Sequence, residues 1–263
     1  MLERETPLRT LSVAGGVALF CSLLVATAVQ LLKPLQLAHA QVERNRSMLV
    51  AAGLTRGAES SDLEVATAFL DLQPRLFDTV NGRFTSDIDL LSYDYRAAVD
   101  DPNTSRALPP ERDPAGIGRL ARYLPLYISL EPETAPVVIV PIYGRGMWST
   151  IYGHVALTGD FDSIAGVSFY EHGETPGIGD RIENPSWQAQ WRGKRALDAD
   201  RSVRLRIAAP ERDIEAEFRI DAITGATVTV AAIERCLRFW LGPDGYGEAL
   251  RQLAEEFRAA RDG

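Results

Sequence analysis

The sequence contains little cysteine: Cys21 and Cys236 are the only two among its 263 residues. No CxxC pair, haem-attachment CxxCH motif or cysteine set for an iron–sulfur cluster is present, which excludes these redox sites. Cys21 lies in a hydrophobic segment far from Cys236 in the chain, and the three histidines (His39, His154 and His172) do not lie at metal-ligand spacing. We therefore expect neither a disulfide nor a metal site.

The chain also lacks an excess of positive charge, with 28 basic and 36 acidic residues and a formal net charge of -8. Without a basic stripe to displace counterions, a nucleic-acid partner is not expected. Gly144-Arg145-Gly146 lacks the third glycine of a dinucleotide fingerprint, and no Walker A motif is present. The chain is therefore not expected to bind NADH itself.

Charge is absent altogether from Leu11 to Leu32, a run of 22 residues. This length is enough to cross a bilayer core as a helix. A signal peptide would have a shorter apolar core and a clear small-residue cleavage site, whereas Lys33-Pro34 follows directly here. We expect a retained membrane anchor. Its orientation is not decided by the basic residues, which flank both sides (Arg4, Arg9, Lys33, Arg44 and Arg46).

The remaining chain changes character near residue 137. Before it, we predict a helix over about 35–53, a capping box at Ser61 to Glu64 that opens a second helix, and a long surface loop over 93–118. After it come β-rich runs, and then two amphipathic helices with apolar stripes before and after Gly242-Pro243. Strands mixed with flanking helices, without regular βαβ alternation, predict an α+β domain.

The segment with the clearest chemical signal is Asp221-Ala-Ile-Thr224-Gly225-Ala226-Thr227. Gly225 and Ala226 are small and leave the backbone open to close approach. Thr227 is expected just before a helix that starts at about residue 229, where free N–H groups and the helix dipole favour a phosphate. The alternative is that Thr227 is an ordinary N-cap residue.

Asp-x-x-Thr-Gly-Ala-Thr resembles the flavinylation motif of FMN-binding domains, which receive FMN through a phosphoester bond from a dedicated transferase. The resemblance implies covalent FMN on Thr227. It also implies that Asp221 occupies the acidic position that the transferase requires, and that Thr224, Gly225 and Ala226 belong to the cofactor site.

Further stretches resemble one member of this group, the C subunit of the sodium-translocating NADH:quinone oxidoreductase. They are GRGMWSTIYG over 144–153, FYEHGETPGIG over 169–179, KPLQ over 33–36, AAGL over 51–54 and the segment 187–194. The resemblance covers nearly the whole chain in matching order. The G subunit of the Rnf complex shares the flavinylation motif and an ETPG-like turn but lacks the Arg-Gly-Met-Trp-Ser-Thr stretch.

The resemblance implies a single N-terminal transmembrane helix followed by a periplasmic α+β FMN-binding domain with a largely antiparallel sheet and flanking helices. It divides the chain into a cytoplasmic tip and anchor (1–34), a helical and loop-rich part of the periplasmic domain (35–136) and the FMN-binding part with the C-terminal helices (137–263). The protein would then lie in the cell inner membrane.

The resemblance also implies that Trp148, Glu174, Thr175 and Ile178 lie near the flavin. From the residues alone, Trp148 could instead pack in the core, and the glycine-rich run 172–179 could be a simple tight loop. His172 and Arg145 could tune the flavin electrostatically or could have a structural role.

The function implied is an electron relay within a six-subunit membrane complex (A to F) that oxidises NADH, reduces ubiquinone and pumps sodium ions. An FMN transferase would mature the chain. The Rnf G-type subunit, a stand-alone anchored periplasmic flavoprotein and a non-catalytic assembly module remain the alternatives.

Overall fold

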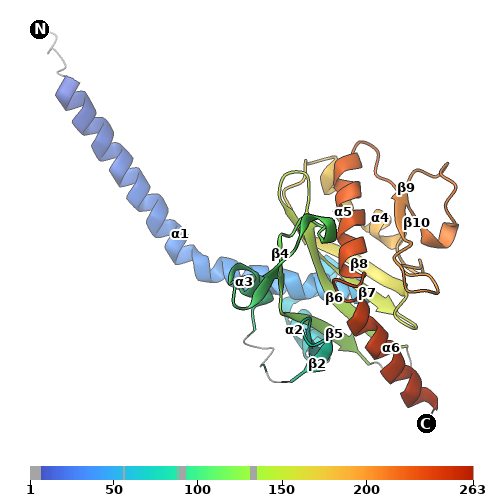
Figure 1. The fold of residues 1–263 in the computed structure, drawn as a ribbon. Coiled ribbons are helices and arrows are strands. Elements are labelled where there is room, and N and C mark those ends of the chain that lie inside the picture. The colour runs from blue at the N-terminus through green and yellow to red at the C-terminus, as the bar shows by residue number, and fades with distance from the viewer. Residues whose placement is uncertain (1–6, 56, 87, 89–92, 131–134, 263) are drawn as a thin grey trace, which may run out of the picture. The chain divides into compact units, whose positions relative to one another are not determined.

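The computed structural model describes residues 7–55, 57–86, 88, 93–130 and 135–262. The chain divides into two compact units, Met1–Glu43 and Arg44–Gly263. The ribbon in Figure 1 follows the chain from its N-terminal helix to the C-terminal helix α6 (Gly247–Asp262).

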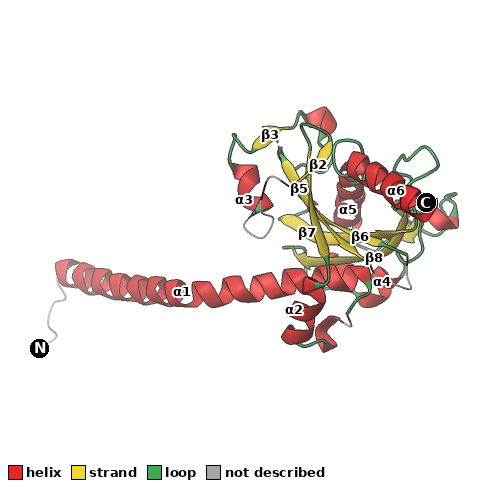
Figure 2. Cartoon of the chain, turned by 90° about the horizontal axis from the view of Figure 1, so that it is seen from below, coloured by secondary structure: helices red, strands yellow, loops and turns green. Residues whose placement is uncertain are grey.

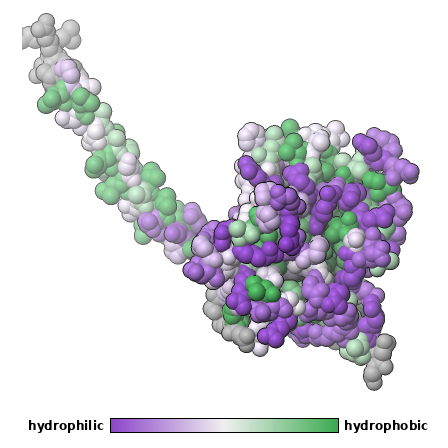
Figure 3. Space-filling model, viewed as in Figure 1, coloured by the Kyte–Doolittle hydropathy of each residue, from purple (hydrophilic) through white to green (hydrophobic). Residues whose placement is uncertain are grey.

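The N-terminal helix α1 (Pro7–Ala52) is continuous and contains Pro34. We predicted an anchor over about 11–32 and a separate helix after it, and the predicted interruption is wrong. Proline removes one backbone hydrogen bond, but this alone does not end a helix when strong helix formers surround it. Leucine, alanine and glutamine occupy most of 35–41. By length and composition α1 is a candidate membrane span, and Figure 3 shows apolar residues gathered along it.

The end of α1 and the start of the next helix follow their sequence signals. Gly53 has φ +75°, and the N–H groups of Gly53 and Leu54 donate to the carbonyls of Val50 and Leu49. This is a glycine C-cap of the Schellman type. After η1 (Gly57–Glu59), α2 (Asp62–Leu70) begins with both bonds of the predicted capping box between Ser61 and Glu64.

The centre of the domain is a six-stranded sheet in the order β2-β1-β5-β6-β7-β8, with every neighbouring pair antiparallel. Its strands are β1 (Gln73–Asp78), β2 (Arg83–Thr85), β5 (Tyr123–Ser129), β6 (Val137–Arg145), β7 (Thr150–Thr158) and β8 (Ser163–Glu171). The three long β-rich runs after residue 137 are therefore confirmed as strands, and so is the α+β fold class. The proposed division at residue 137 stays a prediction, and the sheet takes strands from both sides of it.

The segment 93–118 is more ordered than the single surface loop that we predicted. It contains α3 (Tyr95–Asp100), β3 (Ser105–Ala107) and η2 (Pro110–Arg112), and β3 pairs with β4 (Arg119–Ala121). Asp94 caps α3 by accepting hydrogen bonds from the N–H groups of Arg96 and Ala97. We predicted a loop because this stretch contains four prolines. The short polar side chain of Asp94 nevertheless caps a helix there.

The last third of the chain alternates short elements before its two helices. These are η3 (Gly179–Glu183), α4 (Pro185–Ala189), β9 (Arg206–Ala208), η4 (Ala216–Phe218), β10 (Arg219–Asp221) and α5 (Thr227–Trp240). The β9 and β10 strands pair in parallel as a separate two-stranded sheet. The predicted pair of C-terminal helices is confirmed by α5 and α6.

Helices cover both faces of the large sheet, as Figure 2 shows. On one face lie residues 44–52 of α1 and α2: the Ser47 hydroxyl lies 3.0 Å from His154 Nδ1, and a side chain at Gly166 would collide with the carbonyl of Ala51. On the other face lies α5, where a Cβ at Gly144 would be 3.1 Å from that of Cys236. The closeness of α5 to β6 therefore requires a small residue at this strand position.

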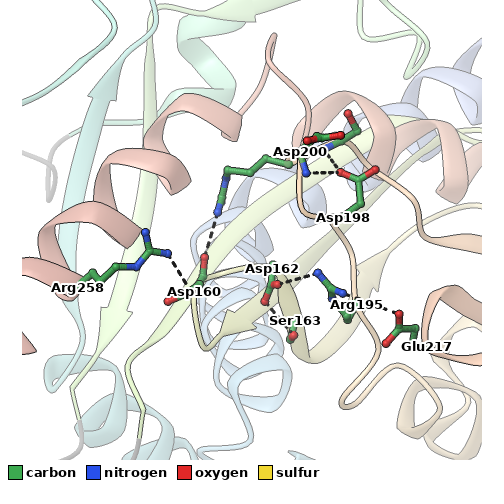
Figure 4. Close-up of polar contacts among 10 residues, drawn as sticks. Asp160, Asp162, Ser163, Arg195, Asp198, Asp200, Glu217 and Arg258 are labelled. Carbon is green, nitrogen blue, oxygen red and sulfur yellow. Dashed lines mark hydrogen bonds and ion pairs between the residues drawn. The ribbon is translucent and has the colours of Figure 1, made fainter.

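The turn between β7 and β8 is attached to α6 by one apolar contact and two ion pairs of Asp160, and to the segment around Arg195 by a further ion pair. Phe161 is fully buried against Phe257 although its φ is +57°, a conformation that costs a non-glycine residue about 1–2 kcal/mol. Asp160 pairs with Arg258 at 2.9 Å, and Asp162 pairs with Arg195, as Figure 4 shows. We expect packing of the Phe161 ring to contribute more to the stability of this turn than its exposed ion pairs.

Replacement of Phe161 and of Asp160 should separate these two contributions. We expect Phe161→Ala to lower the free energy of unfolding by about 3–5 kcal/mol, because it leaves a core cavity. Asp160→Asn should cost no more than about 1 kcal/mol, because its ion pairs are solvent-exposed. Chemical denaturation of the detergent-solubilised chain measures both, and equal losses would contradict the assignment.

His154 is buried in the sheet and titrates unusually. Burial, with Arg44 and Arg96 nearby, lowers the pKa of His154 from 6.5 to about 3. Below pH 6.5 the unfolded chain therefore binds a proton that the folded chain does not. The contribution of the neutral His154 to the free energy of unfolding is therefore fully present above pH 6.5, and it is lost as the pH falls toward 3.

The expected loss from His154 is about 1.4 kcal/mol per pH unit between about pH 6 and pH 4. His154→Gln keeps a polar partner for Ser47 but cannot titrate in this range. The stability of the wild type, measured by denaturant titration, should fall more steeply with pH than that of the variant. Parallel profiles would show that His154 is not kept neutral by the fold.

Candidate functional site

Thr227 is the first residue of α5, with Ala226 at the N-cap position. The helix thus begins two residues earlier than predicted, and Thr227 does not precede it. Ala226 makes no side-chain capping bond, and the Thr227 side chain is exposed. The N-cap interpretation of Thr227 is therefore wrong. Thr227 is an exposed residue at a helix end whose first turn contains no acidic residue, so the helix dipole there is not neutralised from within α5.

Gly225 adopts φ +84°, a left-handed conformation that glycine takes without strain. A Cβ at this position would lie 3.7 Å from Cγ2 of Ile178. The segment 224–227 and the glycine-rich turn 172–179 are therefore in contact, although they are far apart in sequence. Ile178 is 44% exposed, and Thr224 is exposed as well.

Side chains of the segment 187–194 form hydrogen bonds with the backbone of Asp221. Trp187 Nε1 donates to the carbonyl of Asp221 at 2.8 Å, and the N–H of Asp221 donates to Gln190 Oε1 at 3.2 Å. The carboxylate of Asp221 is half exposed and lies 3.7 Å from Arg219 Nε. Two hydrogen bonds thus hold its backbone, while its carboxylate remains half exposed.

Glu174 lies where three segments meet. Its Oε1 accepts hydrogen bonds from the N–H groups of Met147 (2.9 Å) and Trp148 (3.4 Å), in the loop between β6 and β7. Its Oε2 accepts a hydrogen bond from the hydroxyl of Thr229, in the first turn of α5. Glu174 is only 5% exposed. No sequence signal singled out Thr229, because a threonine early in a helix is common.

Trp148 does not pack in the core, since it is 68% exposed. Its indole Nε1 nevertheless donates to the hydroxyl of Thr175 at 3.1 Å. The ring is thus an exposed aromatic surface that is held in one orientation. Met147, Ile178 and Val228 are also large apolar residues that are about half exposed. Exposed apolar groups close to one another indicate a binding surface.

A groove of about 530 Å³ runs along α5 and has Thr227 in its lining. Val230, Ala231, Glu234 and Arg235 continue the lining along one face of the helix, opposite Ile207 of β9. Arg206, Arg212 and Arg235 give this groove positive charge, of which Glu234 neutralises part by pairing with Arg206. The size is in the range of pockets that hold small organic ligands.

The structure thus brings together most of the residues singled out from the sequence. Ile178 lies against Gly225 beside Thr227. Glu174 and Thr175 are hydrogen-bonded to Trp148, in the loop over 146–149 that we call the Trp148 loop. The arginines of the groove were missed, because single arginines in loops resemble any solvated surface. Among the described residues no group of three or more histidine, cysteine, aspartate or glutamate side chains could hold a metal ion.

Comparison with known families places this region in one of them. Residues 146–242 match the model of the FMN-binding domain. This range includes Trp148, the turn 172–179 and the segment 221–227.

Curated relatives match the chain over almost its full length. It is 37% identical to the C subunit of the Na(+)-translocating NADH-quinone reductase of Pseudomonas aeruginosa, over 96% of this chain and 98% of the relative. The C subunit of the same reductase from Yersinia pestis is also 37% identical, over 94% of this chain and 93% of the relative.

The fold of this chain is also similar to that of solved structures. The crystal structure of Shewanella oneidensis NqrC has a TM-score of 0.75 and 34% identity, and covers 83% of this chain and 99% of that chain. The C subunit of the Na(+)-translocating NADH-quinone reductase from Parabacteroides distasonis has a TM-score of 0.61 at 21% identity, covering 80% and 92%; this second likeness concerns the fold alone.

Proposed function

Because the chain belongs to the family of C subunits of the Na(+)-translocating NADH-quinone reductase, we propose that it relays electrons through FMN esterified to Thr227. Membership makes it an electron-transfer subunit of that multi-subunit oxidoreductase. Family membership argues against the Rnf G-type subunit. It also favours a subunit of a complex over a stand-alone flavoprotein or an assembly module. When bound, FMN accepts and donates electrons, and the protein supplies position and electrostatic environment.

The residues around Thr227 fit a flavin phosphate and its ring. Thr227 is an exposed hydroxyl-bearing residue at the amino end of α5, where free N–H groups stabilise phosphate oxygens. Arg212 and Arg235 in the adjoining groove add positive charge for a phosphate. The exposed ring of Trp148 and the side chain of Ile178 provide an apolar surface on the other side of Gly225. The exposed position of Thr227 at the amino end of α5 is the observation that carries the proposal.

Attachment requires that a transferase reach the segment 221–227. Thr224, Gly225 and Thr227 are exposed, and the carboxylate of Asp221 is half exposed. Gly225 and Ala226 leave no side chain that would block the approach to Thr227. We therefore assign Asp221 to recognition by an FMN transferase, and Thr224, Gly225 and Ala226 to the local backbone shape that the transferase reads.

We assign α1 to the cell inner membrane and the domain from residue 44 to the periplasm. The uncharged run 11–32 within α1 is long enough to span the bilayer. In this assignment the chain assembles with the other members of a six-subunit complex (A to F), which oxidises NADH, reduces ubiquinone and moves sodium ions. A single helix without a charge in the membrane forms no ion path by itself, so sodium would pass through partner subunits.

Thr227 can be tested by replacement when the chain is co-expressed with its transferase. Thr227→Val should abolish flavin fluorescence of the denatured gel band, because it has no hydroxyl to esterify. Thr227→Ser keeps a hydroxyl and should retain the fluorescence, which makes it the matched control. A fluorescent Thr227→Val band, or a dark wild-type band, would refute the attachment site.

The side of the membrane can be tested with cysteine labelling, since the chain has only Cys21 and the buried Cys236. Ala260→Cys adds an exposed thiol in α6. A membrane-impermeant maleimide should label it in cells whose outer membrane alone is permeable. Leu8→Cys, before the apolar run, should react only after the inner membrane is opened. The reverse pattern would place the domain in the cytoplasm.

A further inference from the structure

Both oxygens of the Glu174 carboxylate already accept hydrogen bonds from the chain. Oε1 is occupied by the N–H groups of Met147 and Trp148, and Oε2 by the hydroxyl of Thr229. A buried charge is stable only when such partners are present. Because Glu174 is only 5% exposed, its carboxylate presents little surface to a flavin ring, and its bonds are directed to the chain.

Two glycines make room for this carboxylate. A Cβ at Gly146 would lie 2.5 Å from Glu174 Oε1, and a Cβ at Gly179 would lie 2.8 Å from Glu174 Cβ and 3.0 Å from the hydroxyl of Thr229. Neither glycine has a positive φ. They are therefore required by the close approach of three segments around Glu174 and not by backbone conformation.

The loop that Glu174 holds carries the exposed ring of Trp148. Trp148 is held at two points. Its backbone N–H donates to Glu174, and its indole N–H donates to the hydroxyl of Thr175, which follows Glu174 in the chain. Through Thr229, the same carboxylate is tied to α5 only two residues after Thr227. Movement of the Trp148 loop relative to the start of α5 would therefore break bonds to a buried charge.

We propose that Glu174 and Thr229 are positioning residues that hold the Trp148 ring beside Thr227, and that Glu174 does not itself contact the flavin. The inference rests on the proposed attachment of FMN to Thr227 for its effect on the cofactor. The bracket itself, defined as Glu174 with its bonds to Met147, Trp148 and Thr229, is a property of the chain. Its role is to set the distance between an aromatic surface and the amino end of α5.

The bracket can be measured without the cofactor through amide exchange. In the purified full-length chain, Thr229→Val removes the hydroxyl and leaves Glu174 Oε2 unpaired, so deuterium uptake by the peptide around Met147 and Trp148 should become faster. Thr229→Ser keeps the hydroxyl and should retain the slow uptake. Thr67→Val removes an exposed hydroxyl on α2 and is the control for loss of any threonine. Unchanged uptake in Thr229→Val would overturn the bracket.

The effect on the cofactor can be measured through flavin emission in the native, flavin-loaded protein, because a nearby indole quenches a flavin. Trp148→Leu should raise the emission. Glu174→Ala and Thr229→Val should raise it too, but neither should add to Trp148→Leu in a double variant, since both act through that ring. Glu174→Gln should resemble the wild type, because its amide can accept from the loop and donate to Thr229 without carrying charge.

Each contrary outcome has a separate meaning. If Glu174→Ala changes the emission equally in the Trp148→Leu background, or if Glu174→Gln behaves like Glu174→Ala, then Glu174 acts on the flavin directly and the proposal is overturned. If Trp148→Leu leaves the emission unchanged, the ring is not beside the flavin and the positioning role is overturned. A wild-type chain without flavin would instead refute the attachment to Thr227, while amide exchange still decides the bracket.

Discussion

Antiparallel pairing of β7 with β6 and β8 is the constraint on which the candidate site depends. Because β6 runs into β7 at residues 146–149 and β8 ends at Glu171, the Trp148 loop and the turn 172–179 emerge at the same end of the sheet. The α5 helix packs on β6, and its amino end reaches this same place. Three segments that are distant in sequence therefore meet without any of them crossing the core.

The hydrogen bonds of Glu174, and not a hydrophobic contact, join the three segments where they meet. A buried carboxylate whose two oxygens both accept hydrogen bonds is costly to disturb, because each lost partner leaves charge unpaired in a dry environment. Glu174 consequently fixes geometry more strictly than an apolar side chain of the same size would. The apolar groups nearby, Trp148 and Ile178, are left exposed, so the site combines a rigid base with an open surface. Such an arrangement suits a cofactor that must exchange electrons with partner proteins.

Elements whose signals are local could be predicted from the sequence. The capping box of α2, the glycine that ends α1 and the β-rich runs of β6 to β8 depend on neighbouring residues only. The strands β1 and β5 escaped prediction because neither has a run of β-branched residues like 137–140, which indicated β6 in spite of Pro141, and because Pro74 and Pro125 disfavour strands in general. They are strands because tertiary partners on the sheet override that preference: the carbonyl of Pro125 accepts a hydrogen bond from the buried hydroxyl of Tyr246.

The sequence by itself determined which residue types are available: an uncharged run long enough for a membrane, a Thr-Gly-Ala-Thr segment and a glycine-rich turn. It did not determine that Thr227 lies inside the helix and not before it, or that Trp148 is exposed and not part of the core. Nor did it relate Glu174 to Thr229, 55 residues apart. These relations depend on which segments the antiparallel sheet brings to one end. Local patterns record the preferences of neighbours along the chain, whereas only packing decides which distant groups share a buried charge.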